Sequence, residues 1–373
     1  MSKLNELIQE FCPDGVVYKK VGDIAVVGTG KSDKKDATPD GEYPFYVRSK
    51  IIAKINTFEF DEEAIVIPGE GGIGDIFHYV TGKYALHQRA YRIHFVDNKV
   101  IPKFAYYHFM AHFKVFIIKK AVSATVISIR KPMITDFPVP VPPLEVQKEI
   151  VGILDKFTQL EAELSAELSA RRVQYEYYRS QLLALDGSKE NVTWLTLDDI
   201  ATNFDSKRKP VTRDARTSGD IPYYGASGIV DYVKDYIFDG DYLLVSEDGA
   251  NLLARSTPIA FSISGKTWVN NHAHVLKFEE YATRRLVEIY LNSIDLRPYV
   301  TGAAQPKLNK ANLNKIKIPV PTLAEQKRIV SILDKFDRLV TSISEGLPAE
   351  IEARRQQYEY YRTKLLTFQE LPA

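Results

Sequence analysis

One long segment occurs twice in this chain, and the duplication constrains the fold more than any other feature. Both copies, residues 140–185 and 319–368, open with Pro-Val-Pro and continue through Gln-Lys to Ile-Leu-Asp-Lys-Phe. Both also carry Gln-Tyr-Glu-Tyr-Tyr-Arg, at 174–179 and 357–362. So many identities in the same order indicate an internal repeat.

Apolar residues in both copies recur on an alternating four-three step, which is typical of a coiled coil. The pattern predicts two long helices, the first about 60 Å long at about 1.5 Å per residue. Two matched heptad seams in one chain favour packing against each other over the alternative of two unrelated surface helices. The predicted seam residues are Ile150, Leu154, Phe157, Leu164, Leu168, Tyr175, Tyr178, Leu182, Ile329, Leu333, Phe336, Val340, Ile343, Tyr358, Tyr361 and Leu365.

The second copy contains four additional residues around Gly346 and Pro348. An insertion of four residues is a stutter, which roughly preserves the alignment of the apolar face. Pro348 predicts a local kink or break, because proline lacks the amide that a helix interior uses.

The segments before the two helices also resemble each other. Val21-Gly22-Asp23-Ile24 is echoed by residues 197–200, and Ala90–Phe95 by residues 273–278. Short β-branched and aromatic segments separated by Gly, Asp and Asn predict mixed sheets, so the fold class is α+β with two related globular domains. The predicted boundaries are a first domain at 1–139 with a short helix at 3–12, a helix at 140–190, a second domain at 191–318, and a helix at 319–373.

Composition points to a protein of the cytoplasm that binds an acidic partner. Cys12 is the only cysteine, the N-terminus lacks a signal-peptide core, and no apolar run is long enough to span a membrane. The net charge of +1 hides two tracts without acidic residues, 98–135 and 296–324. Basic tracts suit phosphate backbones, although a solvated surface remains the alternative.

Motifs for catalysis or metal binding are weak. Gly28-Thr29-Gly30-Lys31-Ser32 lacks the first glycine of a phosphate loop, because Ala25 stands there. His272 and His274 have no further ligands nearby in sequence, so we expect no metal. The sequence shows no clustered carboxylates followed by the lysine of a nuclease, no Asn-Pro-Pro-Tyr-like methyltransferase motif, and no nucleophile–base arrangement. We therefore expect a chain without an active site.

The repeated order of globular domain, Pro-Val-Pro, Gln-Lys-x-Ile-Val-x-Ile-Leu-Asp-Lys-Phe and Gln-Tyr-Glu-Tyr-Tyr-Arg resembles the specificity subunit of Type I restriction–modification systems. The resemblance covers nearly the whole chain. It implies that the two globular domains are target-recognition domains, each reading half of an asymmetric, bipartite DNA sequence. It also implies that the two helices form an antiparallel coiled coil that separates the half-sites.

The same resemblance implies partners and cofactors. Two methyltransferase subunits would dock on this chain and methylate adenine with S-adenosylmethionine. Two motor-nuclease subunits are optional further partners, cutting unmethylated DNA with ATP and magnesium. All three cofactors would be held by the partner subunits and none by this chain. The alternative function is a structural coiled-coil adaptor without sequence-specific DNA binding.

Divergent polar loops and the acid-free tracts supply the candidate DNA contacts. In the first domain these are Lys31, Lys34, Lys35, Arg48, Lys50, Gln88, Arg89, Arg130 and Lys131. In the second domain they are Lys207, Arg208, Lys209, Tyr224, Ser227, Asn251, Arg255, Asn271, His272, Gln305 and Lys307. The tyrosines at 175, 177, 178, 358, 360 and 361 could stack on bases, but their heptad spacing favours core or partner contacts.

Overall fold

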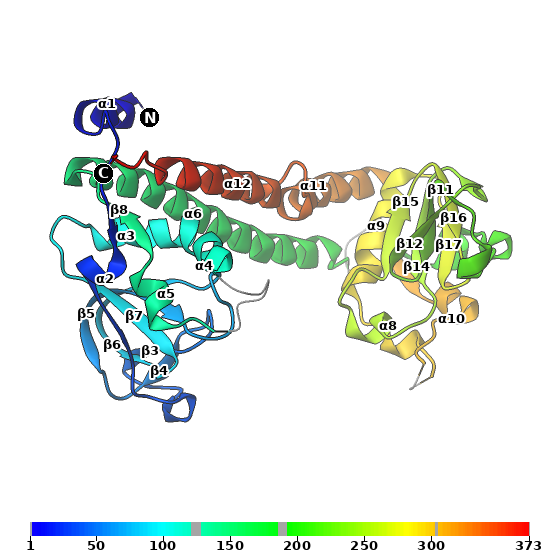
Figure 1. Ribbon diagram of the computed structural model, residues 1–373. Coiled ribbons are helices and arrows are strands. Elements are labelled where there is room, and N and C mark those ends of the chain that lie inside the picture. The colour runs from blue at the N-terminus through cyan, green and yellow to red at the C-terminus, as the bar shows by residue number, and fades with distance from the viewer. Residues whose placement is uncertain (1, 121–127, 186–191, 303–304, 373) are drawn as a thin grey trace. The chain divides into compact units, whose positions relative to one another are not determined.

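The computed structural model describes residues 2–120, 128–185, 192–302 and 305–372. The predicted end of the first long helix at 190 and the predicted domain start at 191 lie outside these residues. The chain divides into two compact units (Figure 1). Unit 1 comprises Met1–Glu167 and Ala349–Ala373, and unit 2 comprises Leu168–Pro348.

Unit 1 is built on one mixed sheet of six strands in the order β2-β7-β5-β6-β3-β4, in which β3 and β6 are parallel and the other pairs antiparallel. Its elements are α1 (Ser2–Phe11), β1 (Tyr18–Lys20), α2 (Val21–Ile24), β2 (Ala25–Thr29), η1 (Lys34–Asp36), β3 (Tyr43–Tyr46), β4 (Ala53–Ile55), β5 (Phe60–Pro68), β6 (His78–Leu86), β7 (Ala90–Phe95), α3 (Pro102–His108), the π turn η2 (Phe109–Phe113), α4 (Lys114–Lys120), α5 (Lys131–Thr135), β8 (Pro138–Pro140) and most of α6 (Leu144–Leu183) with α12 (Leu347–Leu365).

The central strand β5 is buried on both faces. On one face, Ile65 and Ile67 pack in an apolar cluster with Phe109 of η2. On the opposite face, Ala64 and Val66 pack in a second apolar cluster. Side chains alternate between the faces of a strand, so an unbroken apolar run such as Ala64–Ile67 serves two cores at once.

Unit 2 repeats this plan with its strands divided between two four-stranded sheets, β10-β17-β14-β15 and β12-β11-β16-β13. Its elements are β9 (Thr193–Thr196), α7 (Leu197–Ile200), β10 (Thr202–Asn203), η3 (Asp205–Lys207), η4 (Arg213–Ala215), β11 (Ser218–Gly225), β12 (Gly228–Val233), β13 (Phe238–Asp239), β14 (Tyr242–Ser246), α8 (Asn251–Ala254), β15 (Ala260–Ile263), β16 (Lys266–Val269), β17 (Ala273–Lys277), α9 (Tyr281–Ser293), η5 (Arg297–Tyr299), α10 (Lys310–Asn314), β18 (Lys317–Val320) and α11 (Leu323–Thr341). The predicted α+β class with two repeated domains is confirmed.

Each repeated Pro-Val-Pro step overlaps the end of a short strand that lies just before a long helix. In unit 1, Pro138–Pro140 pairs antiparallel with Tyr18–Lys20, and in unit 2 Lys317–Val320 pairs with Thr193–Thr196. Each pair is a sheet of two strands, so the prolines occupy edge positions where their missing amide costs no ladder bond.

The glutamine of the Gln-Lys motif fastens each helix start to its domain. Gln147 is fully buried; its Nε2 donates to the carbonyls of Pro142 and Lys99, both at 2.7 Å, and its Oε1 accepts from Ile101 N at 2.8 Å. Gln326 repeats the arrangement, donating to Pro321 O and accepting from Thr283 Oγ1. This side chain satisfies backbone groups that would otherwise be buried without partners.

The aspartate of Ile-Leu-Asp-Lys-Phe makes the second attachment. Asp155 accepts from Tyr107 Oη at 2.5 Å and from Lys103 Nζ at 2.8 Å. In unit 2, Asp334 accepts from Arg285 Nε and Tyr281 Oη, both at 2.7 Å. The two motifs most strongly repeated in the sequence therefore join the domains to their helices.

The helices pack in antiparallel pairs within each unit. In unit 1, α12 runs alongside the first part of α6 (Figure 1), with Phe157 stacked on Tyr361 and Arg355 paired with Glu161. In unit 2, Phe336 of α11 contacts Tyr175 and Tyr178 of α6. The coiled-coil pairing predicted from the heptads is present in both units.

The predicted second long helix is interrupted, ending at Thr341 and resuming at Leu347. The seam prediction is wrong at Ile343, which lies in this interruption with 89% of its surface exposed. Of the other predicted seam residues, those buried are Ile150, Leu154, Ile329, Leu333, Val340, Tyr358 and Leu365, and those half-buried are Phe157, Leu164, Leu168, Tyr175, Leu182, Phe336 and Tyr361. Tyr178 is more exposed but stacks on Phe336.

Candidate nucleic-acid interface

In unit 1, three segments distant in sequence meet where β5 ends. Gly69 N donates to Arg89 O in the β6–β7 turn, and Ile129 N donates to Gly69 O, both at 2.8 Å. Glu70 and Ser128 form an antiparallel bridge beside them. The acid-free tract is thereby held against the turn that carries Gln88 and Arg89. We call Lys34, Arg48, Glu70, His87 and Arg89 the Glu70 cluster.

The Glu70 cluster is organised by its single carboxylate. Glu70 Oε2 accepts from Arg48 NH1 at 2.9 Å and from Arg89 NH1 at 3.1 Å. The hydrogen bond from Arg89, with the charges of both arginines, lowers the pKa of Glu70 despite some desolvation. Lys34, Arg48, Glu70 and His87 line a cavity of about 300 Å³. The arrangement presents three cations around one anion, which suits a polyanion.

The end of β14 in unit 2 has the same backbone arrangement. Glu247 N donates to His272 O at 2.9 Å, Leu308 N donates to Glu247 O at 2.7 Å, and Asp248 forms a bridge with Lys307. His272 Nδ1 lies 2.9 Å from both carboxylate oxygens of Asp248. We call Glu247, Asp248, His272 and Lys307 the Asp248 cluster.

The two clusters occupy equivalent positions but carry different chemistry. Glu70 corresponds to Asp248, and Arg89 corresponds to His272. Each acidic residue is held by the cationic or imidazole side chain of the following turn. Arg89, His272 and Lys307 are among the residues predicted from the sequence, whereas the carboxylates of Glu70 and Asp248 that organise the clusters are not. The sequence did contain a signal for these carboxylates, because Glu70 and Asp248 each follow a strand at the same place in the two halves of the repeat.

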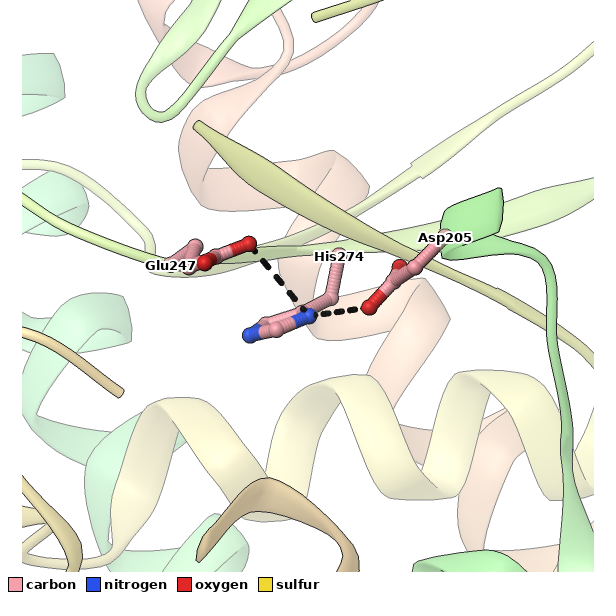
Figure 2. Close-up of side chains that lie close together, drawn as sticks. All are labelled: Asp205, Glu247 and His274. Carbon is pink, nitrogen blue, oxygen red and sulfur yellow. Dashed lines mark hydrogen bonds and ion pairs between the residues drawn. The ribbon is translucent and has the colours of Figure 1, made fainter. Parts of the chain in front are cut away.

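A buried charged network lies next to the Asp248 cluster (Figure 2). His274 Nδ1 is 2.6 Å from Asp205 Oδ2 and 3.8 Å from Glu247 Oε2, and its Nε2 is 2.7 Å from Leu308 O. A carbonyl only accepts, so Nε2 donates to Leu308 O, and Nδ1 faces the two carboxylates. Asp205, Glu247 and His274 each offer one ligand atom, and these atoms lie within 4.8 Å of one another, so the expected absence of a metal stays a prediction.

Two cationic side chains, those of Arg208 and Lys307, complete the network. Arg208 NH1 donates to Glu247 at 2.6 Å, and Lys307 Nζ lies 3.1 Å from the other Glu247 oxygen. Burial alone would raise the pKa of Asp205 and Glu247, but their bonds and charges with His274, Arg208 and Lys307 lower both. The network joins η3, β14, β17 and the second acid-free tract.

Acid should therefore destabilise unit 2. Carboxyl groups with a pKa lowered by folding contribute stability above their unfolded pKa and lose it as pH falls through the folded value. We expect unfolding free energy to fall progressively below about pH 4.5, where unfolded Glu and Asp protonate. Glu247→Gln should be less stable at pH 7 but lose less on acidification, measured by denaturant unfolding across pH. An equally steep acid loss in both proteins would contradict this role.

The structure distributes the predicted DNA contacts over exposed loops. Sixteen of them are exposed: Lys31, Lys34, Lys35, Arg48, Lys50, Gln88, Arg89, Arg130, Lys131, Lys207, Lys209, Ser227, Asn271, His272, Gln305 and Lys307. Gln88 Nε2 also donates to Asp33, which brings the lysine-rich loop at 31–35 beside the Glu70 cluster. Gln305 borders residues 303–304, which lie outside the described residues.

Four predicted contacts are partly buried and used by the fold. Arg208 belongs to the charged network, and Arg255 donates to the carbonyls of Leu291 and Ile294 at the end of α9. Their guanidinium groups bond to internal acceptors that the sequence does not reveal, whereas their contact with DNA stays a prediction. Asn251 bonds to Ser256 and Thr257 within its own loop, and the ring of Tyr224 packs against Phe261.

Within the described ranges, no helix is both long and apolar enough to cross a membrane.

A family model described as the Type I restriction modification DNA specificity domain matches residues 13–170 and 189–353. The two matched segments fall one on each repeat, and together they include most of the chain.

Three curated proteins illustrate the similarity. A putative type I restriction enzyme specificity subunit of Haemophilus influenzae is 40% identical over 191 residues, covering 50% of this chain and 49% of the relative. The EcoR124I/EcoR124II specificity subunit of Escherichia coli is 37% identical over 244 residues, covering 60% of each. A putative Mycoplasma pneumoniae specificity subunit is 28% identical over 337 residues, covering 85% and 97%. The matches thus span only about half of the first relative's length and 60% of the second's.

Solved structures agree on the fold. The S subunit of the Type I system from M. genitalium aligns with a TM-score of 0.61 at 17% identity, covering 94% of this chain and 96% of that one. A chain from a structure describing assembly and conformational transition of the type I system aligns at 0.62 with 11% identity, covering 95% and 98%. The prediction of the family is confirmed: the chain belongs to the Type I restriction–modification DNA specificity family, and the relatives above are named specificity subunits.

Proposed function

We propose that this chain reads an asymmetric, bipartite DNA target, with each unit reading one half. The observation that carries the proposal is the duplication of one loop architecture with different side chains. The backbone bonds at Gly69 and Glu247 are equivalent, whereas the side chains around them are Arg48 and Arg89 in unit 1 and His272 and Lys307 in unit 2. A shared frame with different polar groups would let two readers recognise different base sequences.

The exposed cations supply the sequence-independent part of binding. Lys34, Arg48 and Arg89 surround one carboxylate in unit 1, so the cluster retains positive charge after pairing with Glu70. Contacts of this kind with phosphates position a protein on DNA and make its affinity depend on salt. The partly exposed ion pairs can open to admit a phosphate because exposed pairs contribute little stability.

Arg48→Ala and Lys307→Ala should each weaken DNA binding and reduce the slope of log affinity against log salt by about one. Affinity of the chain with its methyltransferase partner for duplex DNA would be measured at several salt concentrations. Arg328→Ala is the matched control, because Arg328 is an exposed cation of α11 outside the acid-free tracts and pairs with Glu325 of the same helix. Unchanged slopes in both test variants would contradict the proposed contacts.

We further propose that the helices recruit two methyltransferase subunits through a duplicated surface. Tyr177 in unit 2 and Tyr360 in unit 1 are the same residue of the repeated Gln-Tyr-Glu-Tyr-Tyr-Arg motif, and each is 60% exposed. Their neighbours Tyr178 and Tyr361 pack against phenylalanines of the paired helix. An exposed aromatic side chain repeated in both copies suits two identical partners, since tyrosine is enriched in interfaces.

In this proposal the partner subunits catalyse the reactions. The methyltransferase subunits would hold S-adenosylmethionine and methylate adenine. Motor-nuclease subunits, where present, would use ATP and magnesium. This chain would contribute target recognition and partner placement.

Tyr177→Gln and Tyr360→Gln should each lower the number of bound methyltransferase subunits from two to one, and the double variant should bind neither. Native mass spectrometry near the dissociation constant would count the subunits. Tyr236→Gln is the control, because Tyr236 is an exposed tyrosine away from the long helices, with Lys266 lying over its ring. Full occupancy in the double variant would exclude this surface.

A further inference from the structure

We propose that His87 of the Glu70 cluster and Asn270, next to the Asp248 cluster, are equivalent specificity-determining residues, one in each unit. The inference rests on the proposed DNA-reading function and identifies the side chains that would make base contacts from each unit. His87 directly follows β6, which runs parallel to β3, and Asn270 directly follows β16, which runs parallel to β11. His87 N donates to Tyr46 O at 2.9 Å, and Asn270 N donates to Tyr224 O at 3.0 Å.

The same local bond fixes the orientation of both side chains. Arg89 N donates to His87 Nδ1 at 2.9 Å, and His272 N donates to Asn270 Oδ1 at 2.8 Å. In each case the acceptor is occupied by the amide two residues ahead. The neutral imidazole must then carry its proton on Nε2, and the Asn270 amide presents its NH₂ group. Two different residue types thus present an N–H donor from equivalent positions.

Both donors face loops that differ between the units. His87 lines the cavity of about 300 Å³ with Lys34, Arg48 and Ser49. Asn270 Nδ2 lies 3.3 Å from the position that a Cβ on Gly225 would occupy, so it faces the loop leading to Ser227. Among the described residues, neither His87 Nε2 nor Asn270 Nδ2 has a hydrogen-bond partner. His87 and Asn270 are 3% and 7% exposed, so their rotamers are fixed by packing.

A fixed donor of this kind suits recognition of an acceptor on a base edge. Purine N7, guanine O6 and thymine O4 are acceptors in the major groove, and a single N–H donor can bond to any of them. Burial, together with the charge of Arg48, lowers the pKa of His87, which keeps the ring neutral and its tautomer defined. The exposed cations near His87 and Asn270 would bind phosphates, and these two residues would then discriminate between bases.

The competing explanation is that both residues only form the turns. Asn270→Asp separates the two, because aspartate keeps the acceptor for His272 N while removing the donor. His87→Asn preserves the turn but shortens and changes the donor, and it replaces a buried imidazole without adding charge. Each unit is the control for the other within the same protein.

The experiment is modified-base mapping of DNA from cells expressing each variant with the methyltransferase partner. We expect Asn270→Asp to reduce discrimination by about tenfold or more at one or two positions in one half of the motif. His87→Asn should do so only in the other half. Thermal unfolding should show that both variants remain folded. If each folded variant methylates the wild-type motif with undiminished selectivity, the inference fails. If the wild-type complex shows no split motif, the proposed function itself fails.

Discussion

Replacing Arg285 by alanine is expected to lower the free energy of unfolding of unit 2 by about 3–5 kcal/mol. Arg285 bonds to Asp334 and Asp337 of α11, both at 2.7 Å, and to Glu288 of its own helix. Burial alone would lower the pKa of Arg285, but these three carboxylates raise it, so the guanidinium remains charged. Removing it would leave three nearby anions without their common cation.

Denaturant unfolding would measure this loss, with Arg328→Ala as the control. Arg328 lies on α11 and pairs with Glu325 on the exposed side of the helix, with 53% of its side chain exposed. An exposed pair of this kind contributes about 0–1 kcal/mol. Equal effects of the two substitutions would show that the Arg285 network does not hold α9 against α11.

Gln147→Leu should destabilise unit 1 by about 2–4 kcal/mol, because leucine fits the volume but cannot replace the three hydrogen bonds of Gln147. The carbonyl of Pro142 and the amide of Ile101 would lose their side-chain partner. Gln326→Leu should cost less, because Gln326 makes two such bonds, one of them with the hydroxyl of Thr283.

The control for this pair is Gln159→Leu on the exposed surface of α6, where the glutamine bonds only to Glu163. Surface substitutions of this type usually change stability by less than about 0.5 kcal/mol. Thermal or denaturant unfolding would rank the three variants. A Gln147 variant as stable as the Gln159 variant would contradict the role of the Gln-Lys motif as an attachment point.

The repeat allowed the helices and domain classes to be predicted because identical motifs require similar structures. The additional residues around Gly346 also placed a kink or break there, and the second helix is interrupted between Thr341 and Leu347. Pro348 was expected to cause it, but proline is accommodated in the first turn of α12, where its amide is not needed. The chain instead turns at residues 342–346, where Ser342 Oγ accepts from the amides of Ser344 and Glu345. A Cβ on Gly346 would lie 2.4 Å from Arg338 O, so this close approach requires glycine.

The reading sites were only partly predictable. Composition identified acid-free tracts and polar loops, and most of the chosen residues are exposed. It could not show that Gly69, Arg89 and Ile129 are joined, because that contact depends on strand register and on a connection from a distant tract. For the same reason, Arg208 and Arg255 could not be distinguished from available cations before their internal acceptors were known.

If the two units are independent readers, exchanging one of them should change only one half of the recognised DNA sequence. Residues 191–318 would be replaced by the corresponding domain of another specificity subunit, and modified bases mapped by long-read sequencing in cells that also express the methyltransferase partner. With two independent readers, we expect a split motif in which one half changes and the other half is preserved. A continuous motif, simultaneous change of both halves, or no sequence-specific methylation by the wild-type complex would contradict this expectation, the last outcome favouring a structural adaptor.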